Sequence, residues 1–217
     1  MIIYHGSKNI IEKPIFKKGN IYNDYGLGFY CTESLELAKE WACTDFEASC
    51  YANKYEIDES KYKVLDLTKY SILNWMAILL KFRSFSINTV VGREAKEFLI
   101  NNYYIDVDKY DIIIGYRADD SYFSFAKDFI NNVISIKQLE EAMYLGELGI
   151  QIVLKSKDAF DNIKYLGSDT VNPVEYYDKR IKRDETARKY YTNNTKKIDS
   201  NDLFIMDIIR RGGKDVN

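Results

Sequence analysis

The residues best suited to chemistry in this sequence are polar or aromatic side chains at places where a strand pattern favours an aliphatic residue. His5 ends the apolar run of residues 2–4 and is followed by Gly6 and Ser7. An imidazole at this place either satisfies a hydrogen bond within the core or faces a ligand. Gly6 would let a ligand approach the backbone closely enough for its N–H and C=O to bind a flat amide, and Ser7 adds a hydroxyl group.

A second group follows the turn-rich segment 7–28, which we expect to be a long loop. Tyr30 ends a short strand pattern over residues 28–31, and Trp41 lies 11 residues later on the helix that follows Thr32. A strand end and the third turn of the next helix can converge on one slot, which two aromatic rings would line as a sandwich for a planar ligand. The alternative is ordinary core packing. The glycines match neither GxGxxG nor the GK[ST] ending of a phosphate-binding loop.

Further polar positions come later in the chain. Gln151 interrupts the apolar strand pattern IQIVL, and because a buried amide needs partners it either bonds the backbone or faces a cleft. Arg117 and Asp120 follow the apolar segment YDIIIGY. Adjacent carboxylates after a buried strand would deprotonate an acceptor, bind a cation or, as Asp120, cap the following helix.

Hydrophobic periodicity predicts the elements that must hold these residues in place. Strands are expected over 2–5, 28–31, 53–57, 62–67, 110–116 and 150–154, and helices over 33–42, 72–80, 90–101, 122–133 and 136–148. Thr32 is the expected N-cap of the first helix, Val133 the end of an inward-facing stripe, and Ser135 with Gln138 a capping box. Short strands separated by helices of varied length, without a steady βαβ rhythm, predict an α+β fold rather than a doubly wound sheet.

Length and charge divide the chain unevenly. We expect one domain over residues 1–170 and a basic, helical extension over 171–217 packed on it. The extension carries 11 Lys and Arg against 8 Asp and Glu. Its basic residues and tyrosines would either contact a nucleic acid or form a solvated helix packed through Tyr177, Ile181 and Tyr191. The stripe from Leu203 to Ile209 could pack against a partner.

Composition also bounds the setting of the protein. Three cysteines without a CxxC motif, together with a first segment that lacks a secretory pattern, predict reduced thiols and a cytoplasmic location. No apolar run approaches the length of a membrane span, so no membrane partner is expected. His5 is the only histidine in the sequence, which makes a zinc site improbable and leaves the expected chemistry without a metal.

The order of these residues resembles a known family. A first-strand His followed by Gly and Ser, a GFY strand whose helix carries an aromatic residue, and a late-strand Gln resemble the H-Y-[E/Q] signature of diphtheria-toxin-like and poly(ADP-ribose)-polymerase-like ADP-ribosyltransferases. The chain is still more similar to bacterial proteins that share a domain of unknown function, several of them from toxin–antitoxin loci. Those proteins share YHGS, D-[FY]-G-x-G-F-Y-x-T, a YDIIIG-type strand followed by A-[DN]-D, and a late-strand Gln, a likeness that covers most of residues 1–166.

The resemblance implies a fold and a site. The fold would be two small mixed or antiparallel sheets that form a split NAD-binding cleft with flanking helices, and NAD+ would be the co-substrate. His5 would bind the adenine-side ribose, Gly6 the nicotinamide carboxamide, and Gln151 the 2′-hydroxyl of the nicotinamide ribose. Tyr30 and Trp41 would stack on the nicotinamide ring. The same expected NAD+-binding set is completed by Ser7, Thr32 and Arg117, with Asp120 on the acceptor side.

Two departures from the family pattern narrow the expected activity. Gln151 replaces a Glu, and an amide cannot ionise, so single-unit transfer is expected rather than poly(ADP-ribose) synthesis. Ala38 stands where relatives carry a Ser that binds the carboxamide. The expectation is a mono-ADP-ribosyltransferase that modifies a protein or nucleic acid, and the toxin of a toxin–antitoxin pair with a cognate antitoxin. The alternatives are an NAD+ glycohydrolase and a non-catalytic module that binds a nucleotide or RNA.

Overall fold

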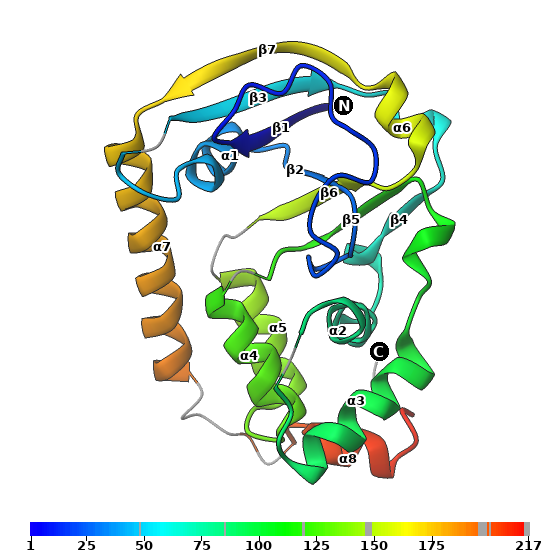
Figure 1. Cartoon of the computed structure of the whole chain (residues 1–217). Helices are drawn as coiled ribbons and strands as arrows, with labels where there is room; N and C mark the ends of the chain where they lie inside the picture. Colours follow the sequence, from blue (N-terminus) through cyan, green and yellow to red (C-terminus); the bar gives the residue numbers. More distant parts are fainter. Residues whose placement is uncertain are drawn as a thin grey trace.

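A computed structural model describes residues 1–47, 49–84, 86–118, 120–145, 149–194, 199 and 201–214. These residues form two small sheets surrounded by helices (Figure 1), so the predicted α+β class is confirmed. Among them, no helix combines the length and the apolar character that crossing a bilayer requires.

The sheets differ in the direction of their strands. The first sheet is antiparallel, in the order β1 (Ile2–Ser7), β3 (Cys50–Glu56) and β7 (Lys164–Val171). The second is mixed, in the order β2 (Phe29–Cys31), β6 (Ile150–Leu154), β5 (Ile112–Tyr116) and β4 (Val64–Asp66), with only the β4 and β5 pair parallel among the described strands. An isolated bridge between Tyr4 and Thr32 links the two sheets.

Helices pack on both sheets. They are α1 (Leu35–Ala42), α2 (Ile72–Phe82), α3 (Val90–Tyr103), α4 (Asp120–Ile130), α5 (Ile136–Leu145), α6 (Lys157–Asn162), α7 (Pro173–Asn194) and α8 (Ile205–Arg210). Helix α1 packs against β1 and β3, whereas α2 is enclosed between the second sheet and the group α3, α4 and α5 (Figure 1). The main core lies there because α2 is apolar on nearly every side, so it can only be stable when it is surrounded.

The C-terminal extension lies against the body of the protein. In α7, Arg183 makes two hydrogen bonds of 2.8 Å to the buried carboxylate of Glu40 on α1. Ala187 is buried, and the Tyr191 ring stacks on Phe125 with centroids 3.8 Å apart. Ile181, expected to face the body, is instead 40% exposed. Helix α7 is thus held against the body of the protein by the side chains of one of its faces.

The apolar stripe near the C-terminus packs on its own chain. Ile205 and Ile208 of α8 are fully buried, and α8 contacts α3. A short bridge between Ser135 and Phe204 also ties this region to the start of α5. Contacts within the chain therefore account for the buried residues of the Leu203 to Ile209 stripe.

Several local expectations need correction. The N-cap of α1 is Ser34 rather than Thr32, because the Thr32 backbone pairs with Tyr4 and its hydroxyl accepts the Ser34 N–H. Val133 is 57% exposed, since α4 ends at Ile130 and the positive φ of Asn132 turns the chain away. The strands expected over 53–57 and 62–67 have other bounds, since β3 begins at Cys50 and β4 covers only Val64–Asp66.

The capping box at the start of α5 is confirmed. Ser135 N–H donates to the Gln138 side chain at 2.9 Å, and Gln138 N–H donates to the Ser135 hydroxyl at 3.2 Å. Both residues are buried, so each polar group has the partner that burial requires.

Candidate functional site

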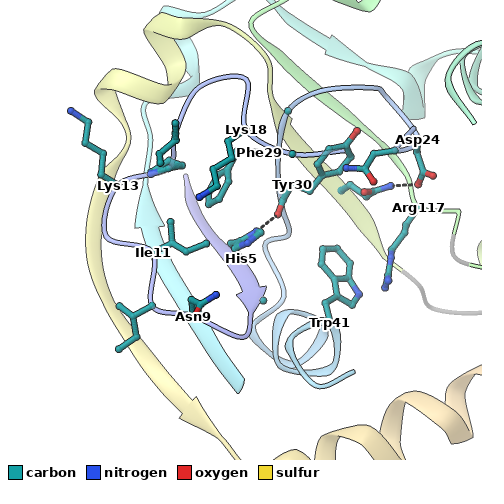
Figure 2. A pocket seen from close by; sticks show the side chains of 18 of the residues that line it. His5, Asn9, Ile11, Lys13, Lys18, Asp24, Phe29, Tyr30, Trp41 and Arg117 are labelled. Carbon is teal, nitrogen blue, oxygen red and sulfur yellow. Dashed lines mark hydrogen bonds between the residues drawn. The ribbon is translucent and has the colours of Figure 1, made fainter. Parts of the chain in front are cut away.

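A cavity of ≈ 750 Å³ opens where β1 and β2 separate beyond the bridge between the sheets. His5, Tyr30, Trp41 and Gln151 all line it, although they come from β1, β2, α1 and β6. Figure 2 shows the His5, Tyr30 and Trp41 side chains around one hollow, with Asp24 and Arg117 to one side of it. A volume of this size lies within the range of about 300–1,000 Å³ that small-molecule and cofactor sites occupy.

The His5 imidazole is held in one orientation and one tautomer. Its Nδ1 lies 2.7 Å from the backbone oxygen of Tyr30, and its ring stacks on Phe29. Because a carbonyl oxygen only accepts, Nδ1 carries the proton and Nε2 of the neutral ring is an acceptor. Burial lowers the pKa of His5, which favours this neutral form. Nε2 has no partner within the described part of the chain, so it is available to a hydroxyl donor in the cavity.

Gly6 turns its peptide groups toward the cavity. Tyr4 exchanges both backbone hydrogen bonds with Thr32, at 2.7 and 2.9 Å. Since backbone direction alternates along an antiparallel strand, the N–H and C=O of Gly6 point to the same side, away from β3 and toward Tyr30. The absence of a side chain at Gly6 also has a packing reason. A Cβ at Gly6 would lie 2.0 Å from the Ala38 carbonyl oxygen, so glycine lets α1 pack on β1.

Tyr30 offers a ring face rather than a hydroxyl group. Its hydroxyl donates to Gly26 O at 2.6 Å and accepts from Tyr25 N–H at 3.1 Å. Burial raises the pKa of the Tyr30 phenol, which therefore stays protonated. The hydroxyl thus anchors the segment before β2, and this anchor fixes the ring at the cavity wall.

Gln151 bonds the backbone and also faces the cleft, so both expected possibilities hold together. Its Nε2 donates to Asp24 Oδ2 at 2.7 Å and to Tyr116 O at 3.2 Å. Both partners accept, so the amide nitrogen must face them and the amide oxygen faces away. Within the described residues nothing donates to that oxygen. Gln151 therefore presents a hydrogen-bond acceptor to the cavity.

Asp24 is a buried residue of this site that the sequence pattern did not single out. Its carboxylate is 5% exposed and accepts from Ala118 N–H at 2.8 Å as well as from Gln151, with the Arg83 guanidinium 3.4 Å away. Burial raises the pKa of Asp24, whereas the Ala118 N–H, Arg83, Gln151 and, at longer range, Arg117 lower it. In a segment rich in Gly and Asn, an Asp is typical of a turn, where its side chain bonds the nearby backbone. The available signal was its place at the head of the D-[FY]-G-x-G-F-Y motif.

Trp41 and Arg117 form one wall of the cavity. The Arg117 guanidinium lies 4.4 Å from the centre of the Trp41 ring, a cation–π contact. The Trp41 Nε1–H is buried and has no acceptor in the described part of the protein. Because an unsatisfied buried donor is costly, this N–H favours a ligand or a side-chain rearrangement that supplies an acceptor.

The cavity is electropositive although the whole chain has a net charge of −2. Among the described residues that line it, two are acidic, Glu12 and Asp24, and five are basic: Lys13, Lys18, Arg83, Arg117 and Arg180. Arg180 belongs to α7, so the C-terminal extension contributes to the lining. An excess of cations in a concave site attracts an anionic ligand such as a diphosphate.

Three expected site residues lie elsewhere or outside the described part of the chain. The Ser7 hydroxyl donates to Asn9 O and accepts from the Asn53 side chain, which fixes the turn after β1. Thr32 is buried under the bridge to Tyr4 and is not among the described residues that line the cavity. Asp120 begins α4, and its side chain, like the whole of residue 119, lies outside the described residues. No group of three metal-binding side chains occurs in the portion described.

Comparison with known proteins places the chain in a family. A search of curated proteins and a search of solved structures each found no match. The model of one family, described as "Protein of unknown function (DUF3990)", matches residues 1–165. This match spans both sheets as far as the start of β7 and includes the residues that line the cavity except Arg180. The chain therefore belongs to the DUF3990 family.

Proposed function

We propose that this protein is a mono-ADP-ribosyltransferase that binds NAD+ in the cavity, cleaves the bond between nicotinamide and ribose, and transfers ADP-ribose to a macromolecule. One observation carries the proposal. His5, Tyr30, Trp41 and Gln151, which the resemblance assigns to NAD+, line the same cavity despite their distance in sequence. The H-Y-[E/Q] order therefore has a spatial counterpart in this chain.

The polar groups of the cavity suit the parts of NAD+. His5 Nε2 would accept from a hydroxyl of the adenine-side ribose, and Gln151 Oε1 from the 2′-hydroxyl of the nicotinamide ribose. The outward N–H and C=O of Gly6 match the two ends of a carboxamide. Ala38 offers no hydroxyl group for the same carboxamide, so in this proposal Gly6 binds it alone. The cationic lining would hold the diphosphate.

The proposed reaction needs positioning more than a strong base. The C1′–N bond of the nicotinamide ribose breaks, and its electron pair neutralises the pyridinium ring, which leaves as neutral nicotinamide. An oxocarbenium ion forms at C1′, and an acceptor oxygen or nitrogen attacks it and then loses a proton. The rings of Tyr30 and Trp41 would hold the leaving nicotinamide ring flat. This fixed orientation lowers the entropic cost of reaching the transition state.

The setting follows from the resemblance. Similarity to proteins of toxin–antitoxin loci supports a cytoplasmic toxin, with a cognate antitoxin as its protein partner. The acceptor would be a protein or a nucleic acid. Lys179, Arg183 and Arg188 on α7 all pair with carboxylates of the same chain, which favours an acceptor site at the cavity rather than along this helix.

The direct test uses NAD+ labelled in its adenylate half, incubated with the purified chain and a bacterial lysate. We expect release of nicotinamide and label in a macromolecule, both reduced by Gln151→Ala and unchanged by Asp58→Asn, a surface substitution near β4. Free ADP-ribose without labelled macromolecule would identify a glycohydrolase. Bound NAD+ that is never cleaved would identify a binding module, and neither binding nor release would end the proposal.

A further inference from the structure

The cavity contains a buried carboxylate next to the glutamine that stands where related transferases have glutamate. Asp24 Oδ2 lies 2.7 Å from Gln151 Nε2. We propose that Asp24 supplies the negative charge that Gln151 lacks, and that it acts on the substrate through the Gln151 amide as a positioning residue. This inference rests on the proposed function and assigns a role to a residue that the H-Y-[E/Q] signature does not contain.

The contacts of Asp24 favour its ionised form and oppose the burial that raises the pKa of its carboxyl overall. Within the described residues, the groups that contact its oxygens are the Ala118 N–H, the Gln151 amide nitrogen and the Arg83 guanidinium, and each is a donor. A protonated carboxyl would need an acceptor for its own hydrogen, and the described contacts provide none. The charge is therefore kept in a site from which most water is excluded, where its electrostatic effect is large.

The Gln151 amide can transmit this charge because of how it is oriented. Both of its hydrogens are used, one by Asp24 and one by Tyr116 O, so only its oxygen faces the cavity. Donation to a carboxylate polarises an amide and makes its oxygen a stronger acceptor. A ribose hydroxyl bonded to that oxygen would then be held more firmly as positive charge develops at C1′.

Asp24 is better placed for this role than the other acidic residue of the lining. Glu12 is exposed to solvent and has no described bond to Gln151. Solvent screens an exposed carboxylate, so Glu12 would contribute little to the stabilisation of an oxocarbenium ion. Of the described carboxylates, only Asp24 is both buried at the cavity and bonded to the residue that faces the ribose.

The first test is the isosteric variant Asp24→Asn, with Asp58→Asn as the matched surface control. We expect kcat for nicotinamide release to fall by roughly 10- to 100-fold, the loss seen when a group that orients a metal ligand is removed, taken here as the nearest comparison. KM for NAD+ should change little, because the ground state carries less charge at C1′ than the transition state. Unchanged kcat in a folded Asp24→Asn protein would overturn the inference.

The second test moves the charge instead of removing it. In Asp24→Asn/Gln151→Glu, the carboxylate and the amide exchange places across the same hydrogen bond, and Tyr116 O, which loses the Gln151 donor, keeps those of Tyr25 and Trp75. We expect the double variant to recover about tenfold of the kcat lost in Asp24→Asn, since the charge returns to the ribose side of the pair. If Asp24 were merely structural, the second substitution would add its own disturbance. A double variant no faster than Asp24→Asn would contradict the proposal.

A third variant decides the matter if Asp24→Asn does not fold. Arg83→Gln removes an attracting cation, so the pKa of Asp24 rises and the acid limb of kcat should move to higher pH. The other groups that face Asp24 are Arg117, Gln151 and the phenols of Tyr25 and Tyr30.

His5 also titrates on the acid side, but its imidazole bonds Tyr30 O rather than Asp24. Its contribution should therefore stay in place in Arg83→Gln. Arg93→Gln, on the exposed surface of α3, is the control. If the acid limb of kcat in Arg83→Gln lies at the same pH as in Arg93→Gln, the role of Asp24 is overturned and the proposed function is not. A wild-type chain that never cleaves NAD+ would overturn the proposed function and this inference together.

Discussion

Substitution of His5 separates its two proposed roles, because each ring nitrogen has a different partner. Nδ1 donates to Tyr30 O at 2.7 Å, which is a structural bond, and Nε2 faces the cavity. His5→Asn keeps a donor near the Nδ1 position but has nothing at the Nε2 position. His5→Ala removes both. The pair of variants therefore distinguishes a ligand contact from a structural one.

The magnitudes follow from hydrogen bonds of known type. Loss of the Nε2 contact should weaken NAD+ binding by about 0.5–1.5 kcal/mol, or roughly 2- to 10-fold in Kd, in both variants. His5→Ala also leaves the Tyr30 carbonyl without its partner. The free energy of unfolding of this variant should therefore fall by ~1–3 kcal/mol, apart from its loss of NAD+ affinity. His5→Asn should lose affinity while it keeps most of its stability.

The pH dependence has a defined sign. Burial lowers the pKa of His5 below the ordinary histidine value of 6.5, so the folded protein resists protonation that the unfolded chain accepts. The contribution to stability is therefore complete above pH 6.5 and declines as pH falls toward the lowered value. NAD+ affinity should persist to the same lowered pKa and then fall, because protonated Nε2 can no longer accept.

Calorimetric titration of NAD+ across a pH series, combined with urea unfolding of each variant, measures both quantities. Equal NAD+ affinity in wild type, His5→Asn and His5→Ala would refute the assignment of Nε2 to the ligand. Affinity that declined near the ordinary pKa of histidine would refute the argument from burial. A stable His5→Ala would show that the bond to Tyr30 contributes little.

Three further predictions concern the frame of the cavity. Arg183→Met strands the buried Glu40 carboxylate and should cost about 3–5 kcal/mol in urea unfolding, most of which Glu40→Leu in the same chain should restore. Gly6→Ala puts a Cβ 2.0 Å from a carbonyl oxygen of α1, so we expect ~1–3 kcal/mol lower stability and weaker NAD+ binding; unaltered melting would contradict the packing. Tyr30→Phe removes the donor to Gly26 O and should cost roughly 1–3 kcal/mol by thermal unfolding, while a loss below 0.5 would rule out this anchor.

The elements that apolar periodicity marks were predictable from the sequence. The strands around 112–116 and 150–154 are buried on both faces and appear as near-continuous apolar runs. By contrast, β7 (Lys164–Val171) was not predicted, since it is an edge strand with mostly exposed or half-buried side chains. Its pairing with β3 comes from backbone bonds that leave little trace in composition.

The candidate site was predictable in its members more than in its contacts. Periodicity and the family resemblance drew attention to His5, Tyr30 and Gln151, and these residues do line one cavity. The bond between Asp24 and Gln151 joins residues 127 positions apart, a separation at which local pattern carries no information. The sequence drew attention to Gly6 as a place where a ligand could approach the backbone. The structure shows that the missing side chain also makes room for α1.

The segment that carries the site also closes the main core, and this limits which variants are informative. Tyr25 donates its buried hydroxyl to Tyr116 O at 2.6 Å, while its own carbonyl accepts from Lys155 at 2.8 Å. Asp24 next to it bonds the strand ends of β5 and β6 through Ala118 and Gln151. Truncation of Tyr25 or Asp24 to alanine would remove a core contact together with a site contact, so lost activity would not identify a catalytic group. Variants that keep shape and move only charge or one donor are therefore the ones that can separate folding from function here.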